Sequence, residues 1–531
     1  MKRLNVLFVN PKQWADAKVN PEKALYPYSI VYIVNFLKKN DLCDVDYIDL
    51  TMEDESVYFE RIKNEHYDLI GITALTTGRL HAIHVVKETR KASPNSKIIV
   101  GGPFFGNKPI ETLHNVPEVD YVCVGEGEHT SAELVQHLQT GTPALHDING
   151  LLYWEDGEIR KNASRKYEKN LDLFDIQEDL ISKPHYKYLH PLKGWEDDPD
   201  KGNAYIIMAG RGCINGCIYC LNSRKPFRHH SVDYLINKVK EIKKKYNTRH
   251  MFFGDPSFAS SSSYLQEFCE RIIEEKLDIE WYCEGRPDIP LDLLELMAKA
   301  GCISYDFAME TGSERVMKKL RRRTDLDMIV NFAKKLNELG VRGDFFTMMS
   351  MPDERGKDLF KTITYIAKLN RLGFKTTLAP FFIVPGTKLE EIAIERGQLA
   401  KDFSWFDETY SCDHHHIHEA KKHIPHYLEY FDSYDLKKLA GFHLAMQDFI
   451  TREPRVRKLR YSFLGTISHV TRFFLKEAEW NDFKYVFDVL SLSAKMYTWF
   501  WLWKLRKPYY DYLERKNSVV EPVAEACCEH E

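Results

Sequence analysis

The stretch that decides the fold reads Tyr205-Ile-Ile-Met208-Ala-Gly-Arg211-Gly-Cys213-Ile-Asn-Gly-Cys217-Ile-Tyr-Cys220. Its first residues predict a short buried strand, which leads directly into a Cys-x3-Cys-x2-Cys loop. With 11 cysteines in 531 residues, chance is a poor explanation of this spacing. Three thiolates on one loop can ligate three irons of a four-iron, four-sulfur cluster and leave the fourth iron open to another molecule. A structural zinc site is disfavoured because it needs a fourth ligand and more often uses paired Cys-x2-Cys units.

A strand-then-helix pattern continues after the cysteine loop. Strands are predicted near 204–209, 250–254, 279–283, 303–309, 343–349 and 376–382, with helices at 232–246, 261–276, 325–339 and 357–372. Six such units predict a (βα)6 partial TIM barrel over residues 201–400. Its active site would lie at the carboxyl ends of the strands.

Residues 1–140 show the same alternation. The predicted strands are Leu4–Val9, Val45–Ile48, Leu69–Thr73, Lys97–Val100 and Tyr121–Val124, with helices near 28–40, 54–65, 79–92 and 128–139. This order predicts an α/β domain with a doubly wound parallel sheet. Turn-rich segments such as Gly101-Gly-Pro103 and Gly125-Glu-Gly-Glu128 follow its strands, at the end where open α/β sheets bind ligands.

Two further regions complete the predicted organisation. Residues 141–200 are interpreted as a linker with a small hairpin near Gly150–Arg160, and residues 401–531 as a helical carboxy-terminal region. The stretch from Met496 to Lys504 is rich in Trp and Tyr, which is typical of peripheral membrane contact. Because a helix of this length spans only about 15 Å, packing of an aromatic face onto the barrel is the favoured interpretation.

Composition excludes several classes of protein. An apolar share of 44% and a net charge of −4 indicate a folded chain. The chain lacks the Lys/Arg excess that phosphate contacts need, so no nucleic-acid partner is expected. No apolar run is long enough for a spanning helix, and the start lacks the pattern of a signal peptide. The irregular cysteine spacing then favours a reducing, cytoplasmic location.

The cysteine loop, with Tyr219 directly before its last Cys, resembles the signature of the radical S-adenosylmethionine (SAM) superfamily. The resemblance implies that Cys213, Cys217 and Cys220 hold a 4Fe-4S cluster whose open iron is chelated by SAM. An external electron donor such as flavodoxin or ferredoxin would drive cleavage of SAM to methionine and a 5′-deoxyadenosyl radical. The resemblance also implies SAM contacts from residues at the strand ends: Asp255, Glu284, Arg286, Glu310 and Ser313. Each of the first four could equally make a structural hydrogen bond at the barrel rim.

The amino-terminal half resembles the cobalamin-binding domain that precedes the barrel in one branch of this superfamily. Four segments carry the resemblance by their order and spacing: Tyr26–Ile30, Gly71–Thr76, Gly101–Phe104 and Val124–Thr130. The Gly-Gly-Pro and Gly-x-Gly pieces of the last two would, taken alone, be ordinary turns. The implied cobalamin-binding residues are Thr73, Thr76, Gly101, Gly102, Gly125, Glu126 and Gly127.

One departure from related cobalamin domains is informative. Domains that place a histidine on the lower face of cobalt carry Asp-x-His-x-x-Gly after the first strand, whereas this chain has Asn10-Pro-Lys-Gln-Trp-Ala-Asp-Ala there. No lower histidine ligand is therefore expected. By the same resemblance, residues Thr73 to Arg79 would lie nearest that face.

Together these features imply a cobalamin-dependent radical SAM methyltransferase that acts on an unactivated carbon of a small-molecule or lipid-like substrate. In the implied mechanism one SAM methylates cob(I)alamin, a second yields the radical that abstracts hydrogen, and the substrate radical takes the methyl group. One alternative is a cyclase or ring-rearranging oxidoreductase with the same cofactors, resembling the anaerobic porphyrin ring cyclases of this branch. Another is a non-catalytic cobalamin or redox sensor.

The remaining cysteines and a histidine-rich stretch have less specific interpretations. The stretch from Cys412 to His418 could hold a second metal or act on substrate, but a polar loop is the favoured interpretation. Five other cysteines lie on apolar patterns and are predicted to be core thiols: Cys43, Cys123, Cys269, Cys283 and Cys302.

Overall fold

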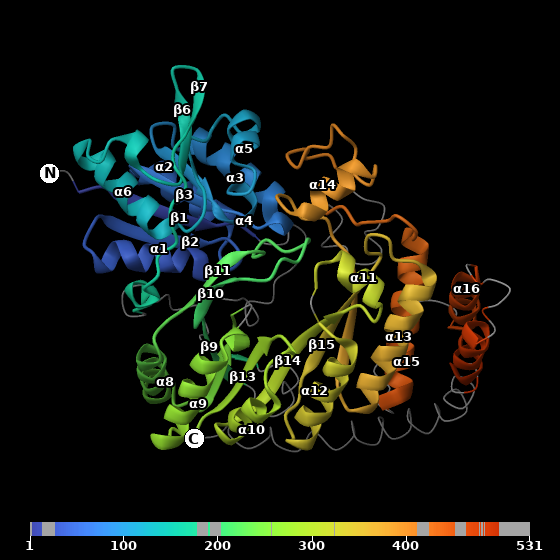
Figure 1. Cartoon of the computed structure of the whole chain (residues 1–531). Helices are drawn as coiled ribbons and strands as arrows, with labels where there is room; N and C mark the ends of the chain where they lie inside the picture. The colour runs from blue at the N-terminus through green and yellow to red at the C-terminus, as the bar shows by residue number, and fades with distance from the viewer. Residues whose placement is uncertain are drawn as a thin grey trace, which may run out of the picture.

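The computed structural model describes residues 3–12, 27–177, 189–191, 203–255, 258–322, 324–410, 424–451, 463–476, 478, 482, 484–496 and 498. These residues form two seven-stranded sheets, one in each half of the chain, and a set of carboxy-terminal helices (Figure 1). The predicted α/β fold class is confirmed.

The first sheet contains the predicted parallel strands in the order β2-β1-β3-β4-β5. They are β1 (Asn5–Asn10), β2 (Asp44–Asp49), β3 (Leu69–Thr73), β4 (Lys97–Gly101) and β5 (Tyr121–Cys123). The connecting helices are α1 (Tyr28–Lys39), α2 (Glu55–Asn64), α3 (Arg79–Ala92) and α6 (Gly127–Thr140), joined by the short α4 (Gly102–Phe105) and α5 (Pro109–Asn115) that the sequence did not predict. Every residue of β1 except Asn5 is buried, as expected for a strand covered by helices on both faces.

The hairpin expected near residue 150 is present, and it belongs to this sheet. Strands β6 (Leu151–Glu155) and β7 (Glu158–Lys161) pair antiparallel with each other, and β6 pairs with β5. The first half of the stretch interpreted as a linker therefore extends the edge of the first sheet.

The second sheet contains six parallel strands in sequence order, which is the predicted open barrel. They are β9 (Asn203–Ile207), β12 (His250–Phe253), β13 (Glu280–Gly285), β14 (Cys302–Glu310), β15 (Asp344–Met349) and β16 (Lys375–Pro380), with β8 (Leu189–Pro191) antiparallel at the edge. The predicted helices are present as α8 (Val232–Tyr246), α9 (Ser262–Glu274), α12 (Leu326–Glu338) and α13 (Gly356–Arg371). Three further helices were not predicted: α10 (Leu291–Lys299), α11 (Glu314–Lys319) and α14 (Lys388–Glu395).

Helix α12 shows how local sequence sets these elements. Its amino-terminal cap is Asp325, whose carboxylate accepts a hydrogen bond from the backbone N–H of Met328. Leu326, Ile329 and Phe332 recur at helical spacing and are buried against the barrel. Burial of this apolar stripe fixes the face that the helix turns to the sheet.

The carboxy-terminal helices α15 (Ser433–Thr451) and α16 (Phe463–Leu475) lie beside α13 and share the barrel's apolar core (Figure 1). Met496, at the start of the aromatic stretch, is buried in that core. Apart from Met496 and Thr498, this stretch lies outside the described residues, as does the histidine-rich stretch at 412–418. No helix in the described part of the chain is long and apolar enough to cross a membrane.

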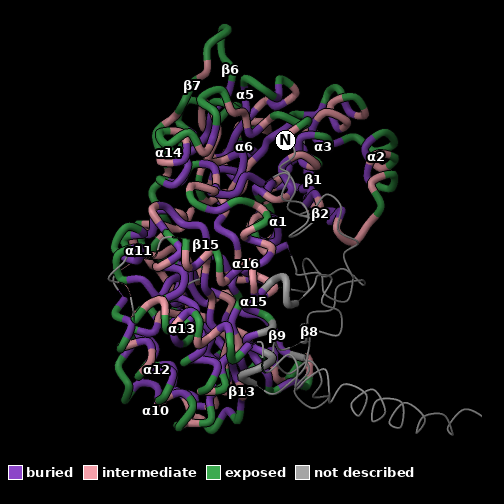
Figure 2. Tube along the Cα trace, turned by 90° about the vertical axis from the view of Figure 1, so that its right-hand side faces the viewer, coloured by how far each residue is buried: buried purple, intermediate pink, exposed green. Residues whose placement is uncertain are grey.

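A second apolar core joins the two halves of the molecule. It contains Val100 and Phe104 from the first sheet's side together with Ile218, Leu320 and Leu389 from the barrel's side. Buried stretches occur in both halves and where they meet (Figure 2). Because Ile218 lies between Cys217 and Cys220, this core also supports the cysteine loop.

Candidate cluster and cofactor site

The cysteine loop is closed at its base by a β-hairpin that the sequence did not predict. Cys213 ends β10 (Gly210–Cys213), which pairs antiparallel with β11 (Lys225–His229). The register shifts between Arg211 and Cys213, and Gly212 at this bulge has φ of +90°. A Cβ at Gly212 would lie 2.1 Å from the Pro226 carbonyl oxygen, so only glycine fits.

Each of the three thiols has a hydrogen-bond donor near its sulfur. The side-chain amide of Asn215 lies 3.3 Å from Cys213 Sγ, and the backbone N–H of Asn222 lies 3.4 Å from Cys220 Sγ. Arg322 Nη1 lies 4.0 Å from Cys217 Sγ. None of the three forms a disulfide, and Cys217 is buried while the other two are partly exposed. Such donors stabilise thiolates, which is the form that ligates iron.

The three cysteine thiols fit a multi-iron cluster better than a single metal ion. In the part of the chain that the structure describes, no three His, Cys, Asp or Glu side chains are grouped to hold one metal ion. A four-iron cluster makes a different demand, because each thiolate binds its own iron. The five cysteines predicted as core thiols are all buried and contribute none of these ligands.

A polar network ties the cysteine loop to the end of β14. The Tyr219 hydroxyl donates to Oε1 of Glu310 over 2.7 Å, and Arg322 Nη1 lies 3.5 Å from the same oxygen. Glu310 is buried and has φ of +65°, where β14 ends in an irregularity. Burial raises the pKa of Tyr219 well above its usual range, so its hydroxyl remains a donor. The network therefore places Glu310, a predicted SAM-contact residue, against the loop itself.

Sequence reasoning missed Arg322. It lies in the run Arg321-Arg-Arg323, which has no local feature that separates a buried arginine from an exposed one. In the structure its Nη2 donates to the Ala308 carbonyl oxygen over 2.6 Å, so the guanidinium links β14 to the cysteine loop.

Asp255 holds the backbone at the start of the cysteine hairpin. Its carboxylate is fully buried at the end of β12 and accepts hydrogen bonds from the backbone N–H groups of Ala209 and Gly210, over 3.0 and 2.8 Å. Burial raises the pKa of Asp255 to about 7, although the two hydrogen bonds oppose this shift. Asp255 thereby fixes the junction from which the cysteine hairpin begins.

The other predicted SAM-contact residues also lie at strand ends. The Ser313 hydroxyl caps α11 and donates to Asp358 over 2.6 Å. Arg286 follows β13 and forms an ion pair with Asp288, while Glu284 lies within β13 and is partly exposed. Ser313 and Arg286 thus have protein partners, and the strand ends bring all of these residues to the same edge of the barrel.

The predicted cobalamin loops lie together at the carboxyl edge of the first sheet. Thr73 and Gly101 end neighbouring strands and are direct partners in the register. Gly102 has φ of +82°, and a Cβ there would lie 2.3 Å from Thr73 Oγ1. Gly125 has φ of +92°, with no atom within 4 Å of its Cβ position. Gly102 is therefore required by the close packing of its own loop against β3, whereas Gly125 borders space that a ligand could enter.

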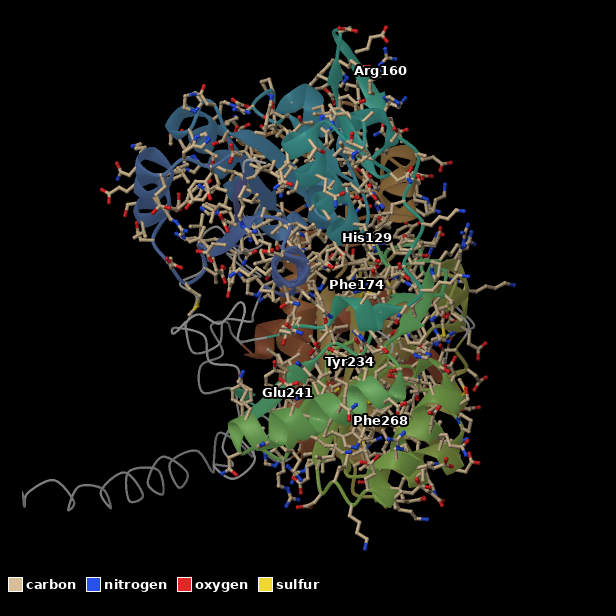
Figure 3. All side chains as sticks on the ribbon, turned by 90° about the vertical axis from the view of Figure 1, so that its left-hand side faces the viewer. His129, Arg160, Phe174, Tyr234, Glu241 and Phe268 are labelled. Carbon is tan, nitrogen blue, oxygen red and sulfur yellow. The ribbon has the colours of Figure 1, made fainter. Side chains whose placement is uncertain are left out.

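The Gly125–Glu128 loop faces the cysteine hairpin. Arg228 on β11 binds the Glu126 carboxylate, with Nη1 3.0 Å from Oε2. Arg211 on β10 lies 2.8 Å from Oε1 of Glu128. Phe174, in the 3-10 helix Leu171–Phe174, and His129 lie at the junction of the two halves (Figure 3). Glu126, predicted to bind a cofactor, therefore contacts the hairpin that carries the cysteines.

Comparison with known families supports the division into two halves. A family model described as a B12 binding domain matches residues 17–135, and one described as the radical SAM superfamily matches residues 207–366. The first covers strands β2 to β5 of the first sheet, and the second begins at the end of β9 and includes the cysteine hairpin.

Individual relatives point in the same direction. An uncharacterized methyltransferase of Pyrococcus horikoshii is 28% identical, over 75% of this chain and 85% of the relative. An anaerobic magnesium-protoporphyrin IX monomethyl ester cyclase of Synechocystis is 24% identical, over 60% of this chain and 63% of the cyclase. The fold matches the solved structure of TsrM from Kitasatospora setae, a radical SAM methyltransferase with cobalamin and a 4Fe-4S cluster bound. The TM-score is 0.64 at 14% identity, over 94% of this chain and 100% of TsrM.

Proposed function

We propose that this chain, in which a B12 binding domain precedes a radical SAM domain, is a methyltransferase acting on an unactivated carbon of a small molecule. When bound, a 4Fe-4S cluster with SAM supplies a 5′-deoxyadenosyl radical, and cobalamin supplies the methyl group. The observation that carries the proposal is the direct packing of the cysteine hairpin against the cobalamin-domain loop that contains Glu126 and Glu128. This packing would bring the two proposed cofactor sites to one junction, as a two-cofactor reaction on one substrate requires.

The chain's own residues would hold and orient these groups. Cys213, Cys217 and Cys220 would ligate the cluster, and Asn222 would donate its backbone N–H to one of the thiolates. Glu310 would keep the loop at the end of β14 through Tyr219. The apolar core between the halves would keep water from the junction.

Gly101 ends β4 and Gly102 begins α4, so their backbone would form part of the sheet edge at which cobalamin binds. The segment from Thr73 to Arg79 would lie nearest its lower face. Within this segment Arg79 is fully buried and donates to the Trp405 carbonyl oxygen over 2.9 Å. This hydrogen bond fixes the end of the Thr73–Arg79 segment.

A cyclase or ring-rearranging oxidoreductase is the second candidate, because one relative is the anaerobic ester cyclase. Methyl transfer is favoured because the methyltransferase relative is more similar and matches more of both chains. A non-catalytic sensor is disfavoured by the presence of both the barrel and the three thiols.

The partners and location follow from the same chemistry. We expect an external electron donor such as flavodoxin or ferredoxin, and a reducing cytoplasm would preserve the cluster. Burial of Met496 favours packing over membrane contact for the start of the aromatic stretch. Flotation of the full chain with liposomes would support membrane contact, and recovery of all protein in the pellet fraction would argue against it.

The proposal is tested with SAM that carries a deuterated methyl group. The protein is reconstituted anaerobically with iron, sulfide and hydroxocobalamin, then incubated with dithionite and a small-molecule extract. We expect S-adenosylhomocysteine, 5′-deoxyadenosine and a deuteromethylated product. Deoxyadenosine together with an unmethylated, rearranged product would instead identify the second candidate.

A further inference from the structure

Arg211 lies on β10, at the start of the barrel half, but its side chain contacts residues that precede the barrel in the sequence. It lies two residues before the first cluster cysteine, yet its guanidinium lies 2.8 Å from Oε1 of Glu128. The guanidinium carbon also lies over two aromatic rings, 4.6 Å from the Tyr32 ring centre and 4.9 Å from that of Phe174. Only 20% of the Arg211 side chain and 4% of the Glu128 side chain are exposed.

Arg228 repeats this arrangement from the other strand of the hairpin. It is the direct register partner of Arg211, so both strands deliver an arginine to the same acidic loop. Its guanidinium binds both carboxylate oxygens of Glu126 and donates to the Glu168 carbonyl oxygen over 2.8 Å. The side chain is only 9% exposed. A bidentate pair of this kind fixes direction as well as distance.

The acidic loop is itself held in place. Glu128 is in the first turn of α6, where the helix dipole favours a carboxylate. Gly127, which begins α6, passes so close to α1 that a Cβ would lie 2.7 Å from the Ile33 side chain. The hairpin therefore docks onto a rigid surface.

We propose that Glu126 and Glu128 are positioning residues that dock the cluster hairpin, through Arg228 and Arg211, and so set the separation between the cluster and cobalamin. The identity of the two cofactors rests on the proposed function, whereas the docking itself rests on the ion pairs. Without Glu128, the buried Arg211 guanidinium would keep only the longer contact with Glu126, whose Oε2 lies 3.7 Å from Nη1. Because a buried charge is costly without a close partner, removing either carboxylate should loosen the hairpin. Reactive groups displaced by about 1 Å can lose on the order of a hundredfold in rate.

The first test needs no cofactor. Glu128→Gln and Arg211→Met are made singly and together in the full-length apo chain, and cleavage by a protease at the hairpin is timed. We expect each single variant to be cleaved on the order of tenfold faster than wild type, and the double variant to add little to either. Glu155→Gln, at an exposed ion pair with Arg160, is the matched control and should leave cleavage unchanged. Independent, additive effects of the two substitutions would overturn the docking.

The second test reads the separation directly. The reconstituted protein is reduced so that both cob(II)alamin and the cluster are paramagnetic, and their magnetic coupling is measured by electron paramagnetic resonance. In Glu126→Gln and Glu128→Gln we expect a weaker coupling at unchanged cobalamin and iron content. Weakened hydroxocobalamin binding with unchanged coupling would instead make these carboxylates cofactor ligands and overturn the proposal.

These readouts separate the docking from the proposed function. A wild-type chain that binds cobalamin and the cluster but transfers no methyl group would count against methyl transfer alone, since the coupling could still be measured.

Discussion

The Tyr219 hydroxyl lies 2.7 Å from Oε1 of Glu310, and this hydrogen bond joins the cysteine loop to the end of a barrel strand. Glu310 is 7% exposed, so little water is available to replace a lost partner. Arg322 also pairs with this carboxylate, and its Nη1 lies near Cys217 Sγ. Tyr219, Glu310 and Arg322 therefore form one hydrogen-bonded network.

Tyr219→Phe should therefore destabilise the protein by about 1.5–3 kcal/mol, the usual loss for a hydrogen bond to a charged group. Glu310→Gln should cost more, about 3–5 kcal/mol, because Arg322 would remain buried without its carboxylate. Denaturant unfolding of the apo chain measures both. Tyr153→Phe is the matched control, since the buried Tyr153 hydroxyl has no hydrogen-bond partner. Equal losses for the two tyrosine variants would show that Tyr219 makes no such bond.

Gly102→Ala should abolish cobalamin binding. Its φ of +82° and the 2.3 Å distance from a Cβ to Thr73 Oγ1 would force the β4–α4 loop away from β3. Gly141→Ala has a similar φ of +76° with no atom within 4 Å, so it should cost about 1 kcal/mol of stability and leave binding intact. Titration with hydroxocobalamin, followed by absorbance, compares the two. Normal binding by Gly102→Ala would mean that this loop does not form the cobalamin site.

Glu354 should make stability depend on pH. It is fully buried in the segment between β15 and α13, its Oε2 accepts from the Met351 backbone N–H, and its Oε1 has no hydrogen-bond partner. Burial raises the pKa of Glu354 from 4.5 to about 8. Because the pKa of Glu354 is raised in the folded state, its protonated form favours folding. This contribution to the free energy of unfolding is complete below pH 4.5 and is lost as the pH rises through about 8.

Glu354→Gln cannot lose a proton, so its stability relative to wild type should rise from pH 5 to pH 9 by on the order of 4 kcal/mol, at about 1.4 kcal/mol per pKa unit. Thermal unfolding of both proteins at these two pH values measures the difference. A constant difference between the proteins at both pH values would exclude titration of Glu354 in this range.

Local patterns in the sequence were enough to predict the buried strands and the cysteine loop. Strands β1, β3 and β4 are short apolar runs, and the spacing of the three cysteines by itself identifies the loop. The β10–β11 hairpin has no such signal, because Lys225–His229 is charged and becomes a strand only through pairing with β10.

The long-range ion pairs also had no indication in the sequence. Glu126 and Arg228 are separated by 102 residues, and nothing near either residue identifies its partner. The loop at Gly125–Glu128 was therefore recognised as functional, but its contact with the cysteine hairpin was not predicted.

The most direct measurement is the yield of 5′-deoxyadenosine from SAM under dithionite, after anaerobic reconstitution with iron, sulfide and hydroxocobalamin. Wild type is compared with Cys217→Ala and with Cys269→Ala, which removes a buried thiol of the same barrel. We expect deoxyadenosine from wild type and Cys269→Ala, and only background from Cys217→Ala with its cobalamin retained. Equal yields from wild type and Cys217→Ala, or none from wild type, would contradict the assignment of the three cysteines to a SAM-cleaving cluster.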